Sequence, residues 1–253
     1  MKKSSGIFAP APRPDATHRL FCLPYAGGSS ITYLDWQHEI DPRVELICIE
    51  PPGRGKRFNE SPIARVDGLV TQLCAELEPW LDRPFSILGH SNGALVGFEL
   101  ARRLALSDKA PDIFFASAKC APSLLERGNL HELTDEELIA ELRATGGTPE
   151  EFFESPELIE LFLPPIRADF ALSETYKYRS APQIRSDLVM LYGKKDDAMD
   201  AGDREAWSRE FSGRALCHAL PGGHFFVDEH PARVIEALNL SFEQLLQAHT
   251  QAS

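Results

Sequence analysis

Cysteine is scarce and scattered in this sequence. The 253 residues include an odd number of cysteines, none in a Cys-x-x-Cys pair: Cys22, Cys48, Cys74, Cys120 and Cys217. That spacing argues against a disulfide framework and against a zinc site. Several of these cysteines lie in apolar runs, where a free thiol behaves as a small hydrophobic side chain. We therefore expect reduced thiols, no bound metal and a cytoplasmic location.

Long apolar runs and an excess of basic residues are also absent. No stretch approaches the roughly 18 apolar residues that a membrane span needs. The short apolar stretch after Lys2 and Lys3 is interrupted by prolines, which argues against a signal peptide. The formal net charge of −12 disfavours nucleic acid or an anionic membrane as the main partner. We expect a soluble, monomeric protein whose residues 1–16 form a flexible lead-in.

Short apolar runs alternate with longer amphipathic stretches in the rest of the chain. Most runs are continuously apolar, as in parallel strands covered on both faces; they lie at 19–23, 45–49, 85–88, 113–118, 188–191 and 214–219. Helical patterns lie between them, at 30–40, 66–81, 94–106, 204–210 and 231–248. This order predicts one α/β domain over residues 17–253, built on a mostly parallel, doubly wound sheet.

Residues 124–178 interrupt the alternation. They contain two helical patterns, 135–145 and 156–163, and the pair Thr134 and Glu137 is typical of a capping box. Insertions in open α/β sheets usually lie over the carboxyl ends of the strands, where ligands bind. We interpret this segment as a helical lid; the alternative is a further pair of helices that cover the sheet.

Ser91 is the candidate nucleophile. It lies in Gly89-His90-Ser91-Asn92-Gly93, directly after a predicted strand and before a predicted helix. A G-x-S-x-G sequence in that context is typical of a nucleophile elbow, whereas without it the glycines would indicate an incidental turn. The backbone N–H of Asn92, at the helix N-terminus, is a candidate oxyanion donor.

His224 and Asp196 are the candidate partners of this serine. A serine hydroxyl needs a base, and His224 follows the last predicted strand in a Gly-Gly-His loop, where the order Ser, Asp, His places it. His218 lies inside a strand pattern, and elbow geometry should point His90 away. Asp196 ends the preceding strand and would orient His224. Asp197 is the alternative acid. The remaining possibility is that these residues form a solvated acidic loop with no part in a triad.

A second oxyanion donor is expected from the loop after the first predicted strand. Residues 23–30, LPYAGGSS, contain two glycines that leave backbone N–H groups unobstructed. The N–H of Ala26 is the first candidate, and that of Tyr25 is the alternative.

The whole pattern resembles the type II thioesterases, the editing enzymes of polyketide and nonribosomal peptide assembly lines. Matching segments run along nearly the entire chain: LPYAGGSS, PPGRGKR at 51–57, GHSNGAL at 89–95, LPPIRADF at 163–170, YGKKD and LPGGHFF at 220–226. Many hydrolases share G-x-S-x-G, but the PGRG and IRADF segments are far more specific to this family.

The resemblance implies an α/β-hydrolase fold with a lid over an acyl chamber. It implies that Ser91, Asp196 and His224 remove stalled or wrongly primed acyl groups from the phosphopantetheine arm of an acyl or peptidyl carrier protein, without a cofactor of the enzyme's own. Three positions depart from the family pattern: Asn92 replaces a usual Met, Tyr25 replaces a frequent His, and Asp197-Ala198 replaces Asp-Pro.

Two sets of charged residues have open roles. Arg54, Lys56 and Arg57 either pair locally or engage phosphate or acidic residues of a carrier protein. Arg167 and Asp169 either form an ion pair that ties lid to core or contact the substrate.

Three other functions fit parts of the pattern. One is a small-molecule carboxylesterase on the same fold, which would not need the PGRG and IRADF segments. Another is a hydrolase-like binding module without activity. The third is a chain-terminating thioesterase, although a chain that starts at Met1 and ends soon after the last predicted helix favours a stand-alone enzyme.

Overall fold

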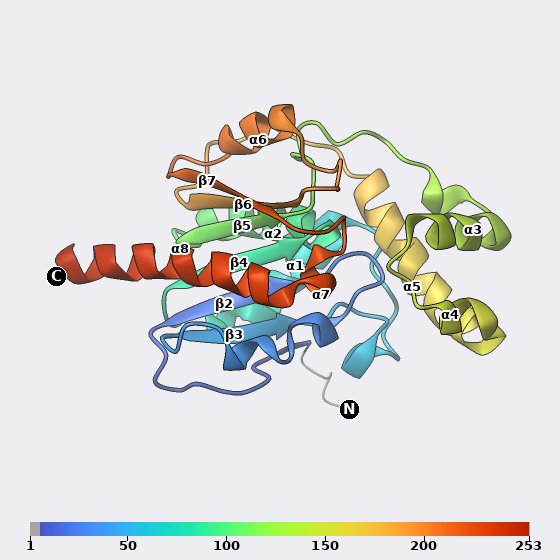
Figure 1. Ribbon diagram of the computed structural model, residues 1–253, viewed down its shortest axis with the longest axis horizontal. Helices are drawn as coiled ribbons and strands as arrows, with labels where there is room; N and C mark the ends of the chain where they lie inside the picture. Colours follow the sequence, from blue (N-terminus) through green and yellow to red (C-terminus); the bar gives the residue numbers. More distant parts are fainter. Residues whose placement is uncertain (1–5, 253) are drawn as a thin grey trace.

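A twisted, mostly parallel sheet forms the centre of the molecule. The computed structural model describes residues 6–252, and within them the sheet has seven strands in the order β1-β3-β2-β4-β5-β6-β7 (Figure 1). Only β1 is antiparallel to its neighbour. The strands are β1 Ile7–Phe8, β2 His18–Leu23, β3 Val44–Ile49, β4 Phe85–His90, β5 Ile113–Ser117, β6 Asp187–Gly193 and β7 Ala215–Leu220. The doubly wound α/β prediction is confirmed.

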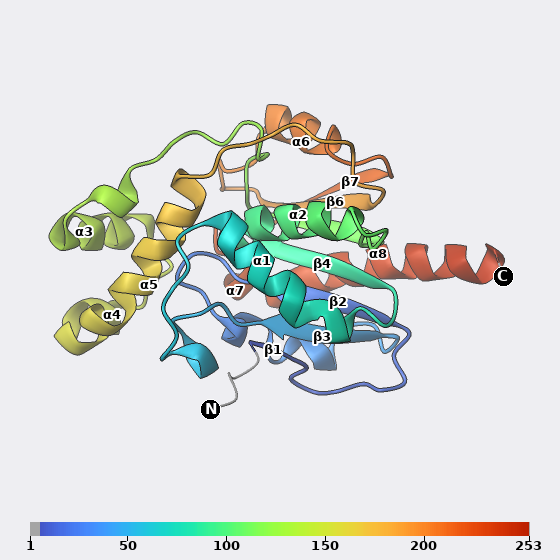
Figure 2. The ribbon, with the colours of Figure 1, turned by 180° about the vertical axis from the view of Figure 1, so that it is seen from behind.

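Helices cover both faces of the sheet. One face is covered by α1 Val66–Leu77, α2 Asn92–Ala105 and α6 Ala201–Ser208, which stand in front in Figure 2. The other face is covered by the 3₁₀ turns η1 Ser30–Tyr33 and η2 Trp36–His38, α7 Phe226–Glu229 and α8 Pro231–Ala252. No helix of the described residues is long and apolar enough to cross a membrane.

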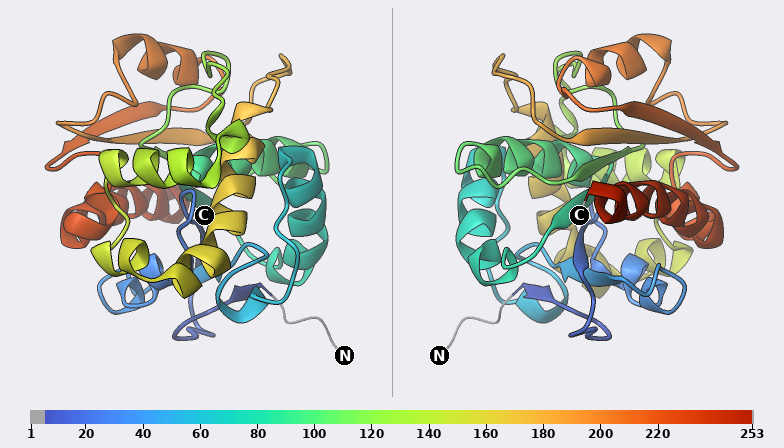
Figure 3. Two further views of the ribbon diagram at one scale, coloured as in Figure 1. Left: turned by 90° about the vertical axis from the view of Figure 1, so that its right-hand side faces the viewer. Right: turned by 90° about the vertical axis from the view of Figure 1, so that its left-hand side faces the viewer.

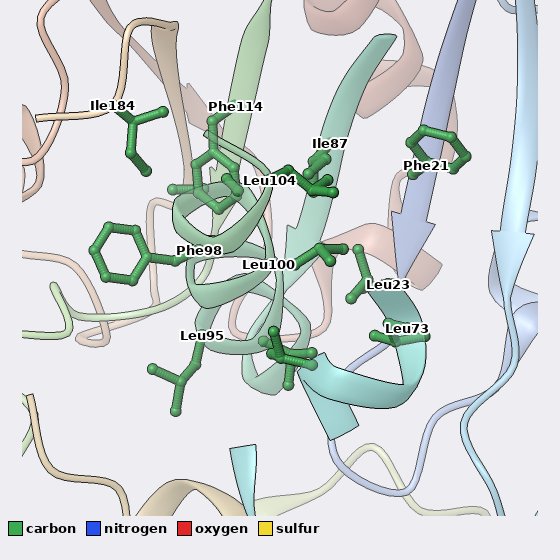
Figure 4. Packing of buried hydrophobic residues seen from close by; sticks show 14 of the residues in the cluster. Phe21, Leu23, Leu73, Ile87, Leu95, Phe98, Leu100, Leu104, Phe114 and Ile184 are labelled. Carbon is green, nitrogen blue, oxygen red and sulfur yellow. The ribbon is translucent and has the colours of Figure 1, made fainter. Parts of the chain in front are cut away.

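The two helical layers explain why most strand sequences are continuously apolar. Successive side chains of a strand point to opposite faces. In β2, Phe21 and Leu23 pack in the layer of α1 and α2, whereas Leu20 and Cys22 pack in the layer of α8. Figure 4 shows Phe98, Leu100 and Leu104 of α2 beside side chains from β2, β4 and β5. This packing fixes α2, and with it the turn that precedes α2.

The segment between β5 and β6 forms a separate helical layer at the carboxyl end of the sheet. It consists of η5 Leu130–Glu132, α3 Asp135–Thr145, α4 Glu150–Glu154 and α5 Pro156–Glu174, which project to one side of the sheet (Figures 1 and 3). The predicted capping box is present, since the Thr134 hydroxyl accepts from the Glu137 N–H and the Glu137 carboxylate accepts from the Thr134 N–H. The segment has its own apolar cluster, including Leu138, Phe152 and Leu163.

Residues 6–16 correct the prediction of a flexible lead-in. β1 pairs with β3, and the Arg13 guanidinium donates to backbone carbonyls, among them that of Asp41 at 2.9 Å. The Arg13 N–H also donates to Glu45 at 3.0 Å. A two-residue strand is too short to show the periodicity of a strand in its sequence. The three prolines are compatible with an ordered segment as well as with a flexible one, so they did not distinguish the two. Residues 1–5 of the predicted lead-in lie outside the described residues.

Two helical predictions had wrong boundaries or type. The predicted helix 30–40 consists of the two short 3₁₀ turns η1 and η2. The predicted helix 156–163 continues through Pro164 and Pro165 to Glu174. Proline removes an N–H donor and usually ends a helix, so the sequence predicted that the helix ends before Pro164. The helix continues because its following turns pack against the core.

Candidate active site

Ser91 occupies a strained turn between β4 and α2. Its backbone has φ 52° and ψ −117°, a conformation that a residue with a side chain rarely adopts. The Ser91 N–H donates to the Ser117 carbonyl of the neighbouring strand at 2.8 Å, which anchors the turn. A Cβ atom on Gly89 would lie 2.2 Å from the Gly93 carbonyl oxygen, and one on Gly93 would lie 2.3 Å from the Leu23 carbonyl oxygen. Both elbow glycines are therefore required by close backbone contacts.

Ser91, His224 and Asp196 form a chain of hydrogen bonds. His224 Nε2 lies 3.0 Å from Ser91 Oγ, and His224 Nδ1 lies 3.0 Å from Asp196 Oδ2. Asp196 comes from the loop after β6, and His224 comes from the loop after β7. The other Asp196 oxygen accepts from the Ala198 N–H at 3.0 Å. This is the arrangement in which a carboxylate orients an imidazole that deprotonates a hydroxyl.

The Asp196 carboxyl, rather than that of Asp197, contacts the imidazole. Burial alone raises the pKa of Asp196, but the hydrogen bond and charge of His224 and the Ala198 N–H outweigh burial and hold that pKa below its ordinary value. Asp196 is therefore a carboxylate near neutral pH. The side chain of Asp197 is exposed.

His90 holds the loop that carries His224. The His90 side chain is fully buried, with Nδ1 2.8 Å from Ser117 Oγ and Nε2 2.9 Å from the His224 carbonyl oxygen. A carbonyl only accepts, so we assign the proton to Nε2, and Nδ1 then accepts from the Ser117 hydroxyl. Burial lowers the His90 pKa to about 3. His90 points away from the reacting serine, as predicted, but its contact with His224 had no signal in the sequence.

The two candidate oxyanion donors come from the start of α2 and from the loop after β2. Asn92 is the first residue of α2, so its N–H is among the first-turn groups that have no partner within the helix. Ala26 lies in the loop after β2 and lines the same cavity as Ser91 and His224. Gly28 N–H donates to the Tyr25 carbonyl at 2.9 Å, which closes this loop into a tight turn. The Tyr25 hydroxyl donates to Asp228 Oδ2 at 2.7 Å.

A cavity of about 760 Å³ opens over Ser91, between the body of the protein and the helical segment. Its wall on the helical side includes the apolar side chains of Leu142, Phe152, Leu158, Phe162, Ile166 and Phe170. A cavity of this size and lining suits a small organic group rather than a polymer. The helical segment thus forms one wall of the chamber that the serine faces, which is the position predicted for a lid.

The arginines of the PGRG segment pair within the protein. Arg54 and Arg57 are 4% and 1% exposed, which places both out of reach of a partner's phosphate. Arg57 pairs with Glu60 at 2.7 Å and with Glu76 at 3.2 Å. Only Lys56 of the predicted cluster is exposed, and its Nζ lies 3.9 Å from the centre of the Phe8 ring. The hypothesis that both arginines engage a carrier protein is wrong, and local pairing is correct.

Arg167 and Asp169 do not pair with each other. Asp169 forms a bidentate pair with Arg54, at 2.7 and 2.9 Å. Arg167 pairs with Asp135 at 2.6 Å and donates to the His131 and Leu133 carbonyls. The Asn92 side chain, at a position where the family usually has Met, donates to the Asp169 carbonyl at 2.6 Å.

None of the five cysteines lines the cavity over Ser91. All five cysteines are free thiols, with Cys22 and Cys48 buried. Among the described residues, no group of three or more His, Cys, Asp or Glu side chains is arranged to hold a metal ion.

Comparison with known proteins identifies the family. The model of the thioesterase domain matches residues 18–242. The chain belongs to the thioesterase family. The gramicidin S biosynthesis protein GrsT of Aneurinibacillus migulanus is 37% identical over 224 residues, which are 86% of each chain. The thioesterase PikA5 of Streptomyces venezuelae is 34% identical over 86% of this chain and 78% of its own.

A solved structure extends the similarity to three dimensions. The type II thioesterase BorB of the borrelidin biosynthetic cluster has a TM-score of 0.84 and 35% identity, covering 94% of this chain and 99% of BorB. The resemblance to type II thioesterases and the α/β-hydrolase fold are both confirmed. Members of the thioesterase family are hydrolases, so the chain is an enzyme of that class.

Proposed function

We propose that this protein hydrolyses acyl thioesters carried on the phosphopantetheine arm of acyl or peptidyl carrier proteins, as an editing enzyme of polyketide or nonribosomal peptide synthesis. The observation that carries the proposal is the Ser91–His224–Asp196 hydrogen-bond chain, which opens into a mainly apolar cavity in a chain of the thioesterase family. The similarity to proteins named for such pathways supports the choice of substrate. The free cysteines support a reducing, cytoplasmic location.

In the first half of the reaction, Ser91 Oγ attacks the thioester carbonyl carbon while His224 Nε2 takes the hydroxyl proton. The negative charge that develops on the carbonyl oxygen is stabilised by the N–H groups of Ala26 and Asn92. The C–S bond then breaks, and the departing sulfur receives the proton from His224. The products of this step are the free thiol of the arm and an acyl ester on Ser91.

In the second half, His224 deprotonates a water molecule that attacks the ester carbonyl. Collapse of this second tetrahedral intermediate breaks the bond to Ser91 Oγ, and His224 returns the proton to the serine. The carboxylic acid leaves and the enzyme is regenerated. Throughout, Asp196 holds the His224 tautomer and stabilises the imidazolium. No cofactor takes part in these steps.

The test compares one acyl group on three leaving groups: a carrier-protein thioester, a small-thiol thioester and an oxygen ester. We expect hydrolysis of both thioesters to exceed that of the ester, and Ser91→Ala to abolish all three activities. Faster cleavage of the ester would identify a carboxylesterase instead. If the wild type failed to react with a fluorophosphonate probe, the binding-module alternative would replace the enzyme.

A further inference from the structure

The loop that carries Ala26 is bound directly to helix α5. The Gly27 N–H donates to Asp169 Oδ2 at 2.8 Å. Gly27 has φ +73°, and a Cβ atom there would lie 3.2 Å from Cγ1 of Ile166, one turn earlier in α5. A glycine at this position thus supplies both the backbone conformation and the room for α5 to approach. Figure 1 shows α5 between the end of the sheet and the outer helices α3 and α4.

The Asp169 carboxylate also connects this loop to Arg54. Two guanidinium nitrogens of Arg54 bind the two Asp169 oxygens, and Nη1 also donates to the Gly28 carbonyl at 2.9 Å. The loop is therefore held at two consecutive residues, through the N–H of Gly27 by Asp169 and through the carbonyl of Gly28 by Arg54. Arg54 and Asp169 are both buried, with 4% and 9% of each residue exposed, so solvent screens the pair little.

A third contact reaches the other oxyanion donor. The Asn92 side chain donates to the Asp169 backbone carbonyl at 2.6 Å. Asp169 thus contacts Asn92, whose N–H is one candidate donor, and also Gly27, which follows Ala26, the other candidate. One residue of α5 links the two backbone segments that must converge on the substrate carbonyl.

We propose that Arg54 and Asp169 are positioning residues that set the geometry of the oxyanion hole. Oxyanion stabilisation depends on donors that are already in place when charge develops, and loss of one donor typically costs about 100- to 1,000-fold in rate. A buried ion pair contributes little net stability compared with apolar residues of equal volume. The geometry that the pair imposes on the oxyanion hole therefore explains the presence of two buried charges better than a gain in stability does. The inference rests on the proposed function for the roles of Ala26 and Asn92. It also assigns one shared task to the PGRG and IRADF segments, which meet at this pair.

The experiment uses Asp169→Asn, which keeps the shape of the side chain, and Arg54→Lys, which keeps its charge. Each variant is measured for kcat and KM with a small-thiol thioester and for the rate of Ser91 labelling by a fluorophosphonate, whose adduct also uses the oxyanion hole. We expect kcat and the labelling rate to fall together by about 10-fold or more, with KM within about 2-fold of wild type. Asp135→Asn is the matched control, because it breaks the pair between Asp135 of α3 and Arg167 of α5 and should leave both rates unchanged.

Arg54→Lys supplies the test if Asp169→Asn does not fold, and circular dichroism and thermal melting establish which variants are native. A folded variant that labels and turns over at wild-type rates would overturn the inference. So would a rise in KM alone, because that result would assign the pair to substrate binding. A wild-type protein that labels but does not cleave thioesters would contradict the proposed function, while the labelling rates would still test the ion pair.

Discussion

His90 Nε2 lies 2.9 Å from the carbonyl oxygen of His224, so one imidazole holds the backbone of the other. The two rings have different surroundings: His90 is fully buried, whereas His224 is partly exposed in the loop after β7. Because burial lowers the His90 pKa to about 3, His90 stays neutral during the proton transfers that we propose for His224. A second positive charge close to His224 would oppose that proton transfer, and a neutral His90 avoids it.

The buried His90 predicts a stability loss on acidification. Its folded-state pKa of about 3 lies below the ordinary value of about 6.5, so between these values the unfolded chain binds a proton that the folded protein excludes. Stability from this residue is therefore fully present above pH 6.5 and decreases as the pH falls toward 3. From pH 6.5 to 5, urea unfolding of wild type should lose about 1 kcal/mol per pH unit more than that of His90→Gln.

His38→Gln provides the control for this comparison, because His38 is exposed and its removal should leave the slope as in wild type. Parallel pH profiles for wild type and His90→Gln would show that His90 is accessible to protons in the folded state. Activity provides a second reading. His90→Gln should lower kcat, because the His224 carbonyl loses a geometrically matched donor.

Asp196→Asn should lower kcat by about 1,000- to 10,000-fold, because an amide at this position favours the wrong tautomer of the catalytic imidazole. The structure predicts this for Asp196 alone, whose Oδ2 lies 3.0 Å from His224 Nδ1. Asp197→Asn is the matched control and should retain nearly full activity. Steady-state kinetics with one thioester substrate give kcat for both variants. A large loss of kcat in Asp197→Asn would show that Asp197, and not Asp196, is the acid of the triad.

Two glycines of α2 should respond differently to alanine. In Gly93→Ala the new methyl group would lie 2.3 Å from the Leu23 carbonyl oxygen, a backbone atom that cannot move without displacing β2. We expect a loss of about 3 kcal/mol or more in unfolding free energy, or no folded protein. In Gly97→Ala the nearest atom is a side-chain methyl carbon of Ile87 at 3.1 Å, and alanine favours the helix by about 1 kcal/mol. The second variant should stay within about 1 kcal/mol of wild type, and equal losses in both would contradict the clash argument.

Much of the fold was predictable because two-sided burial leaves a simple trace in the sequence. Strands such as β3 and β5 are apolar at nearly every position since a helical layer lies on each face. Short elements that depend on a few specific contacts have no comparable pattern in the sequence. β1 is two residues long and depends on pairing with β3, and η1 and η2 share the apolar spacing of a longer helix.

The site was predictable to the extent that chemistry and chain order restrict it. Ser91, Asp196 and His224 follow the carboxyl ends of β4, β6 and β7, so the parallel topology alone brings them to one edge of the sheet. Long-range pairs were not predictable in this way. Arg54 and Asp169 are 115 residues apart, and the sequence around each residue gives no indication that the two form a pair.

Arg57 should prove to be a stability residue rather than a docking residue. Its guanidinium is buried between Glu60 and Glu76 and donates to the Glu50 carbonyl at 3.2 Å. Removing one partner of such a buried network leaves uncompensated charge, which typically costs about 3 kcal/mol or more. Arg57→Gln should therefore lower the urea midpoint and reduce kcat/KM, if at all, equally for carrier-bound and small-thiol thioesters. Lys56→Gln, one residue earlier and exposed, should leave the midpoint unchanged. A loss in Arg57→Gln confined to the carrier-bound substrate, with an unchanged midpoint, would instead place a carrier-protein contact at this arginine.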